Sequence, residues 1–82
     1  MHPDELLNIQ RRRPFQPFRL HVSDGSSYVI RHPEALLVTR RSAHVGVAGD
    51  GGVPEHAVIV SLIQVSQLEE LPAGTPAAGN GA

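Results

Sequence analysis

Residues 18–32, FRLHVSDGSSYVIRH, contain two short runs of alternating apolar and polar residues on either side of Asp24-Gly25. Alternation of this kind around an Asp-Gly pair is typical of a β-hairpin with one buried face. The hairpin also has a register that can be tested, because a shift of one residue would turn every side chain of one strand to the other face. Residues 18–32 therefore define the face of the predicted sheet against which the rest of the chain must pack.

The apolar pattern distinguishes two turns. If only two residues formed the loop, Tyr28 and Ile30 would point away from Phe18 and Leu20. If the loop has three residues, a type I turn closed by a left-handed Gly25 bulge, then Tyr28 faces Leu20 and Ile30 faces Phe18. One face of the hairpin is then apolar throughout, so we predict the bulged turn. In this register Val22 faces Ser26, and the outward residues are Arg19, His21, Ser27, Val29 and Arg31.

Length and composition restrict the class of protein. A chain of 82 residues has room for one domain with a small core. Cysteine is absent, which excludes disulfides, thiolate nucleophiles and cysteine-ligated zinc, and fits a reducing compartment. No apolar run is long enough for a membrane span or a secretion signal. We expect a cytoplasmic protein without a membrane partner.

The charge is unevenly distributed. Residues 1–49 carry a net charge of +3 and residues 50–82 one of −4, which together give the −1 of the whole chain. All seven cationic side chains are arginines. A positive field over the whole protein is therefore excluded, whereas a local basic patch is not.

The remaining segments follow from their apolar period and their prolines. A helix is predicted over His2–Arg12, with Pro3 in its first turn and Pro14 ending it. The step His32-Pro33-Glu34 ends the second strand of the hairpin, and Pro33 disfavours a helical conformation at His32. The later elements are a strand over Ala35–Thr39, a turn at Arg40-Arg41, a strand over Ser42–Val47, a flexible loop over Ala48–Pro54, a strand from Ala57 interrupted near Ser61–Gln64, and a last strand over Val65–Leu71.

A helix followed by short sequential strands with tight turns predicts a mainly β fold, a strongly bent five-stranded antiparallel sheet or a small barrel. Residues 1–71 form this single domain. Residues 72–82, PAGTPAAGNGA, contain only small or turn-favouring residues and no charged side chain. We expect this tail to be disordered.

The order of a helix, a VSDG turn between alternating strands and the closing run IVSLIQVSQLEEL over residues 3–71 resembles the architecture of Sm-like proteins, including Hfq. The stretch RRRPFQPFRLHVSDG, the RHPE step, RRS and the VSL segment also resemble small bacterial proteins of unknown function. The Sm-like resemblance implies a small β-barrel that can bind RNA. However, the positions where that family places its base-contacting residues read His32-Pro33-Glu34 and Ser61-Leu62-Ile63-Gln64 here, and neither supplies that chemistry.

Catalytic and metal chemistry have little support. The five histidines show no His-x-His or His-x-x-x-His spacing, and no cysteine completes a ligand set. No Gly-x-Ser-x-Gly elbow is present, and the glycines of residues 49–52 precede neither a helix nor a lysine that would hold a phosphate. We expect a protein that is not an enzyme and needs no cofactor or metal.

Two binding functions stay open. The first is association with a second copy or another protein through the run AVIVSLIQV of residues 57–65, which is too apolar for an exposed edge of a small monomer. Its candidate residues are Val58, Ile59, Val60, Leu62 and Ile63. The alternative is binding of single-stranded RNA or other nucleic acid, since arginine suits phosphate and Tyr28 or Phe15 could stack a base. Its candidate residues are Arg19, Arg31, Arg40 and Arg41.

Overall fold

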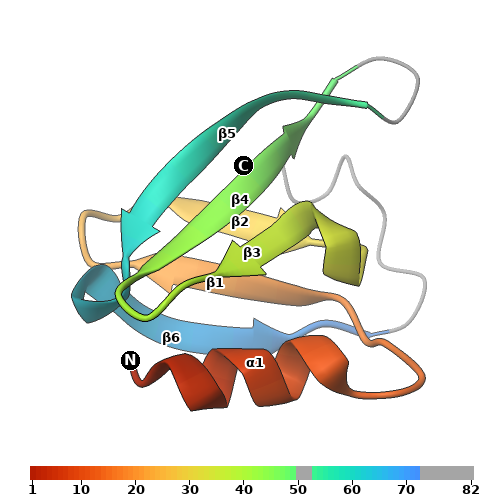
Figure 1. Ribbon diagram of the computed structural model, residues 1–82, viewed down its shortest axis with the longest axis horizontal. Coiled ribbons are helices and arrows are strands. Elements are labelled where there is room, and N and C mark those ends of the chain that lie inside the picture. Colours follow the sequence, from red (N-terminus) through yellow and green to blue (C-terminus); the bar gives the residue numbers. More distant parts are fainter. Residues whose placement is uncertain (50–52, 73–82) are drawn as a thin grey trace.

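A computed structural model describes residues 1–49 and 53–72 of the chain. These residues form one α-helix, two 3₁₀ turns and six strands (Figure 1). In chain order these are α1 (Pro3–Arg11), β1 (Phe18–Val22), β2 (Ser27–Ile30), η1 (Pro33–Ala35), β3 (Leu36–Val38), β4 (Ser42–Ala48), β5 (Pro54–Ser61), η3 (Leu62–Gln64) and β6 (Val65–Glu70). The predicted tail of residues 72–82 lies outside the described residues except for Pro72, and the predicted loop over Ala48–Pro54 lies partly outside them.

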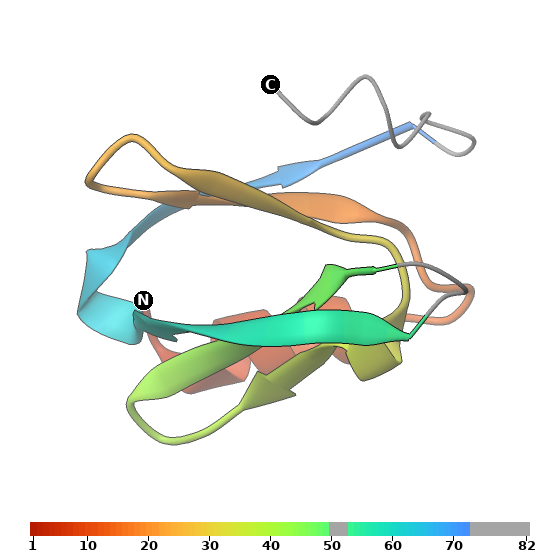
Figure 2. The ribbon, with the colours of Figure 1, turned by 90° about the horizontal axis from the view of Figure 1, so that it is seen from above.

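The strands form two antiparallel three-stranded sheets, in the orders β2-β1-β6 and β3-β4-β5. Figure 2 shows them as two layers, and the chain passes between the layers at η1 and at η3. The mainly β class is confirmed, but the single five-stranded sheet or barrel is not: within residues 1–49 and 53–72 the two sheets do not close into a barrel. The reason is that both 3₁₀ turns interrupt strands, one at Pro33 and the other at Leu62.

The predicted hairpin register is confirmed. Phe18 pairs with Ile30 and Leu20 with Tyr28. The N–H of Val22 donates to the carbonyl of Ser26 at 2.9 Å, and Gly25 has φ +95°, the left-handed conformation that a bulged turn requires. The apolar face of the hairpin therefore points into the molecule.

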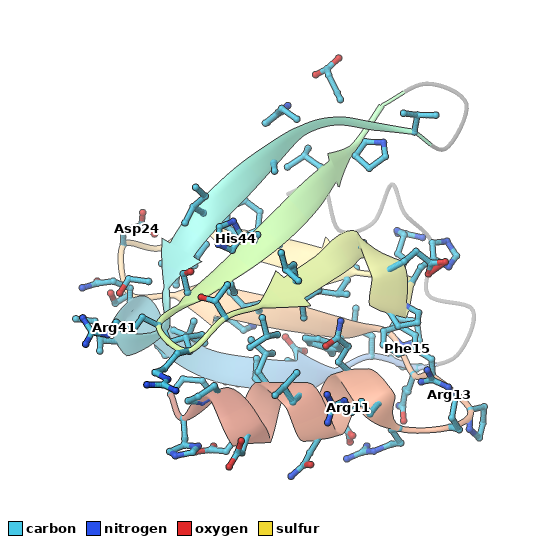
Figure 3. The ribbon with its side chains drawn as sticks, viewed as in Figure 1. Arg11, Arg13, Phe15, Asp24, Arg41 and His44 are labelled. Carbon is cyan, nitrogen blue, oxygen red and sulfur yellow. The ribbon has the colours of Figure 1, made fainter. Side chains whose placement is uncertain are left out.

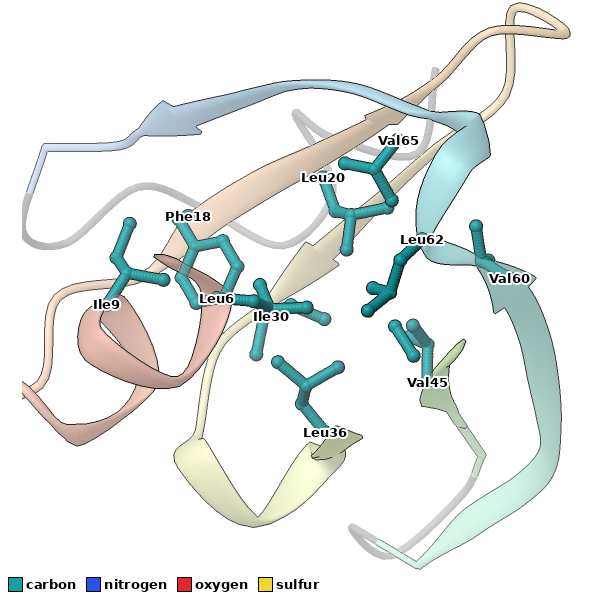
Figure 4. Packing of buried hydrophobic residues seen from close by; sticks show 11 residues of the cluster. Leu6, Ile9, Phe18, Leu20, Ile30, Leu36, Val45, Val60, Leu62 and Val65 are labelled. Atoms are coloured by element: carbon teal, nitrogen blue, oxygen red, sulfur yellow. The ribbon is translucent and has the colours of Figure 1, made fainter. Parts of the chain in front are cut away.

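The core lies between the two layers and is closed by α1 (Figure 4). Five large side chains in it are fully buried: Phe18, Leu6, Leu20, Ile30 and Val45. The alternation of β4 is also as predicted, since Ala43 and Val45 are buried and His44 lies on the other face. The core thus takes residues from the helix and from both sheets.

Helix α1 covers the side of the molecule opposite β5 (Figure 1). Its buried residues are Leu6 and Ile9, the apolar stripe expected from the sequence. The Nε2 of Gln10 donates to the carbonyls of Pro33 at 2.9 Å and Leu36 at 2.6 Å, which attaches the helix to the η1 corner. One open side of the two-layer structure is therefore covered, while the side bounded by β5 carries no helix among the described residues.

A candidate protein-binding edge

Strand β5 is the longest strand at a sheet edge. It spans eight residues, pairs with β4 along one side, and has no strand on its other side in the part of the chain that the structure describes. Its segment Ala57–Ser61 contains no charged residue. A long edge strand with β-branched side chains and no charge is the kind of edge that pairs with another chain.

The backbone hydrogen bonds show which peptide groups of β5 face outward. The N–H of Leu62 donates to the carbonyl of Arg41 at 2.9 Å, and the two strands continue in the register Val60 with Ala43 and Val58 with Val45. Because hydrogen-bonded and non-bonded pairs alternate in an antiparallel ladder, residues 60, 58 and 56 direct their peptide groups toward β4. Those of residues 57, 59 and 61 point to the free edge.

The predicted association residues divide into two groups. Val60 and Leu62 belong to the core, with 6% and 2% of their surface exposed, and Val58 packs against it. The side chains of Val60 and Leu62 are therefore not available to a partner as long as the fold is intact, whereas Val58 is only partly buried. Ile59 and Ile63 are exposed, at 67% and 83%. The alternation of side chains along a strand explains why Ile59 differs from Val58 and Val60, because residues 58 and 60 point to one face of the sheet and residue 59 points to the other.

Ile59 continues an apolar row across the outer face of its sheet. Leu37 pairs with His44, and His44 pairs with Ile59, so these three side chains lie side by side on one face. Leu37 is 63% exposed. His44 is half-buried, and its Nε2 lies 3.0 Å from the hydroxyl of Ser42 (Figure 3). This face therefore has a large apolar side chain on each edge strand.

The other sheet edges are less suited to pairing. Strand β3 has three residues and β2 has four. Strand β6 carries Glu69 and Glu70, and charged side chains on an edge oppose pairing with another strand. Arg12 forms an ion pair with Glu70, which places the end of α1 beside this edge. Among the described edges, β5 is thus the one with a stretch of five residues, Ala57–Ser61, that contains neither a charge nor a proline.

A hollow of about 260 Å³ lies between the start of β2 and the end of β5. This volume is below the range that usually accommodates a small-molecule substrate, roughly 300–1,000 Å³. The hollow is lined by both apolar and polar side chains. Its lining residues are Val22, Asp24, Ser26, Tyr28, Val58, Ile59, Val60, Ser61 and Gln64.

The four predicted nucleic-acid residues do not come together. Arg19 lies on the face of β1 that points away from the core, 3.6 Å from the carboxylate of Glu69, and Arg31 directly follows the end of β2. Arg40 and Arg41 form the turn between β3 and β4 in the other sheet, where both are exposed (Figure 3). The basic residues are thus split between the two layers.

The two candidate stacking aromatics are used by the core. The ring of Phe15 lies 6.1 Å from that of Phe18, centre to centre, and Tyr28 packs against the buried cluster. Both rings are therefore partly covered by the core.

Metal-ligating side chains do not gather in the described residues. No group of three histidine, aspartate or glutamate side chains there is arranged to hold a metal ion. His21 lies 3.0 Å from a carboxylate oxygen of Glu69, as a pair on the outer face of its sheet. Nor does any helix in residues 1–49 or 53–72 have the length and hydropathy of a membrane span.

Comparisons with known proteins give no relative to which this edge could be traced. No protein-family model, no curated protein and no solved structure matches the chain.

Proposed function

We propose that this chain is a non-enzymatic binding module that uses the free edge of β5 to pair with another protein chain, either a second copy of itself or a different partner. One observation carries the proposal: the outward peptide groups of residues 57, 59 and 61 lie in an uncharged segment of an edge strand. Pairing with a further strand would satisfy these groups and remove Ile59 from water.

The exposed surface near β5 supports the same function. Ile59, Leu37 and Ile63 are three of the four large apolar side chains that are exposed in the described chain, and Ile59 and Leu37 share one sheet face. Adjacent exposed apolar residues of this kind mark interaction surfaces more often than isolated ones. The small hollow beside β5 favours a protein partner over a substrate.

Light scattering on the purified chain tests the self-associating form. We expect a mass above that of the monomer at high micromolar concentration. Ile59→Pro removes one outward N–H without removing a hydrogen bond to β4, and proline is tolerated in edge strands with this orientation. It should give a folded monomer.

Ile59→Val is the matched control, because it keeps the N–H and the β-branched side chain, and it should assemble like the wild type. A wild-type chain that stays monomeric at high micromolar concentration would overturn self-association. Circular dichroism of Ile59→Pro checks that the loss of assembly is not a loss of fold.

Nucleic-acid binding is the second candidate function, and the exposed Arg40-Arg41 turn favours it. Neither arginine forms an ion pair within the part of the chain that the structure describes, so both guanidinium groups are available to phosphate. A labelled single-stranded RNA should then be retained at low salt and released as salt rises, with weaker retention by the Arg40→Ala, Arg41→Ala double variant. No retention at about 50 mM salt would exclude this function.

A further inference from the structure

The two ends of the β5 edge differ in charge. Glu55 lies near its beginning, with its side chain 74% exposed and the imidazole of His56 3.6 Å away. The end of β5 lies beside the Arg40-Arg41 turn, since Leu62 is hydrogen-bonded to Arg41. Between these ends the segment Ala57–Ser61 is uncharged. The edge thus runs from an acidic end through an uncharged centre to a basic end.

We infer that the occupant of this edge is a second copy of the same chain, paired antiparallel about a two-fold axis at Ile59; this step rests on the proposed function. Antiparallel pairing places the acidic end of each copy beside the basic end of the other, twice. A parallel arrangement would bring like charges together. The charge order of the edge is therefore complementary to itself only in the antiparallel orientation.

The hydrogen-bond pattern fixes the register. Residues 57, 59 and 61 present outward peptide groups, so they must face one another across the axis. An axis at Ile59 pairs Ile59 with its own copy and Ala57 with Ser61 of the second copy. All paired residues then lie in the uncharged segment, and the two β3-β4-β5 sheets become one six-stranded sheet.

This register also places the side chains suitably on both faces. On the outer face the two Ile59 side chains meet, and the row from Leu37 through His44 continues from one copy into the other. On the inner face Val58 of one copy lies opposite Val60 of the second. These valines stand beside the hollow whose lining includes Val22 and Tyr28. Pairing therefore removes Ile59 from water on the outer face, while on the inner face Val60 already belongs to the core and the partly buried Val58 gains contact.

Single-cysteine variants test the axis directly, because the natural chain contains no cysteine. In a hydrogen-bonded antiparallel pair the Cα atoms are about 5.5 Å apart, which is within the range of a disulfide. We expect Ile59→Cys, treated with diamide as oxidant, to form a covalent dimer about tenfold or more faster than Ala57→Cys at equal concentration. Residue 57 lies four positions from its own copy in this register and should cross-link poorly.

A mixture of two variants gives the second measurement. Ala57→Cys mixed with Ser61→Cys should yield a cross-linked heterodimer faster than either variant yields its own dimer, because residue 57 faces residue 61 of the second copy. Mass spectrometry of the mixture distinguishes the three products.

The outcomes separate this inference from the proposed function. If the wild type assembles but Ile59→Cys cross-links no faster than Ala57→Cys, the two-fold pairing at Ile59 is overturned while edge pairing stands. If the wild type is monomeric in light scattering, both self-association and this pairing are overturned. Assembly together with rapid cross-linking of Ile59→Cys supports both.

Discussion

At the level of single residues, Gly25 is the position where backbone conformation alone sets the choice of amino acid. Its φ of +95° is unfavourable for side chains with a Cβ, yet a Cβ built there would meet nothing within 4 Å. We expect Gly25→Ala to lower the free energy of unfolding by about 1 kcal/mol or more without any steric clash. Urea unfolding measures the loss. Gly25→Asn should lose less, and equal stability of the alanine variant and the wild type would contradict the bulged turn.

Asp24 in the same turn gives a prediction about pH. The hydroxyl of Ser26 at 2.6 Å and its N–H at 2.9 Å donate to the carboxylate and lower the pKa of Asp24 below its ordinary value. A lowered pKa means that the turn gains stability above the ordinary aspartate pKa and loses it as the pH falls through the value in the folded state.

Ser26→Ala should therefore raise the pKa of Asp24, because it removes the hydroxyl donor and keeps the N–H. An NMR titration of the Asp24 carboxyl carbon measures the change. The variant should also lose less stability than the wild type between neutral pH and a pH below the ordinary aspartate pKa. An unchanged midpoint in the titration would show that the hydroxyl does not stabilise the carboxylate.

At the level of elements, Leu6 is the most deeply buried side chain of α1. Leu6 is completely buried in the core, whereas Asn8 lies on the solvent-exposed side of the same helix. We expect Leu6→Ala to reduce the free energy of unfolding by about 3 kcal/mol. This is a large part of the total of roughly 5 to 10 kcal/mol for a domain of this size. Asn8→Ala, the control, should change stability by less than about 0.5 kcal/mol.

The elements were largely predictable, but their grouping into sheets was not. Alternation gave the register of residues 18–30, and the prolines gave the end of α1 and the break after β2. The alternation of apolar and polar residues within each strand does not predict which strands pair with one another in a sheet. The short breaks at η1 and η3 were recognised as interruptions, yet only the structure shows that each transfers the chain to the other sheet.

The candidate edge was predictable in the same partial way. The run of residues 57–65 indicated an interaction strand, and its alternation could have separated Ile59 from Val58 and Val60. The opposite exposures of Leu62 and Ile63 do not follow from a two-residue period, because both lie in a 3₁₀ turn. The separation of the four arginines also required the sheet topology, since Arg19 lies in β1 of one sheet and Arg40-Arg41 join β3 to β4 of the other.

At the level of the whole molecule, the two open sides of the layered structure differ in what covers them among the described residues. Helix α1 covers one side with Leu6 and Ile9, and the ion pair of Arg12 with Glu70 lies at the end of that side. The side bounded by β5 has the uncharged segment Ala57–Ser61 and the hollow instead. The side bounded by β5 is the one where we propose that a second copy of the chain pairs.

Such a cover would make the stability of the protein depend on its concentration. If two folded copies pair, association stabilises the folded state, and each tenfold rise in concentration adds up to about 0.7 kcal/mol per chain, or roughly 3 to 5 °C in Tm. We expect this shift in calorimetric scans of the wild type across the concentration range in which it assembles. Ile59→Pro should have a Tm that does not change with concentration, because the edge that joins the copies is blocked while the core is intact. A concentration-independent Tm of the wild type, measured where light scattering shows an oligomer, would mean that the oligomer survives unfolding and is not held by the folded β5 edge.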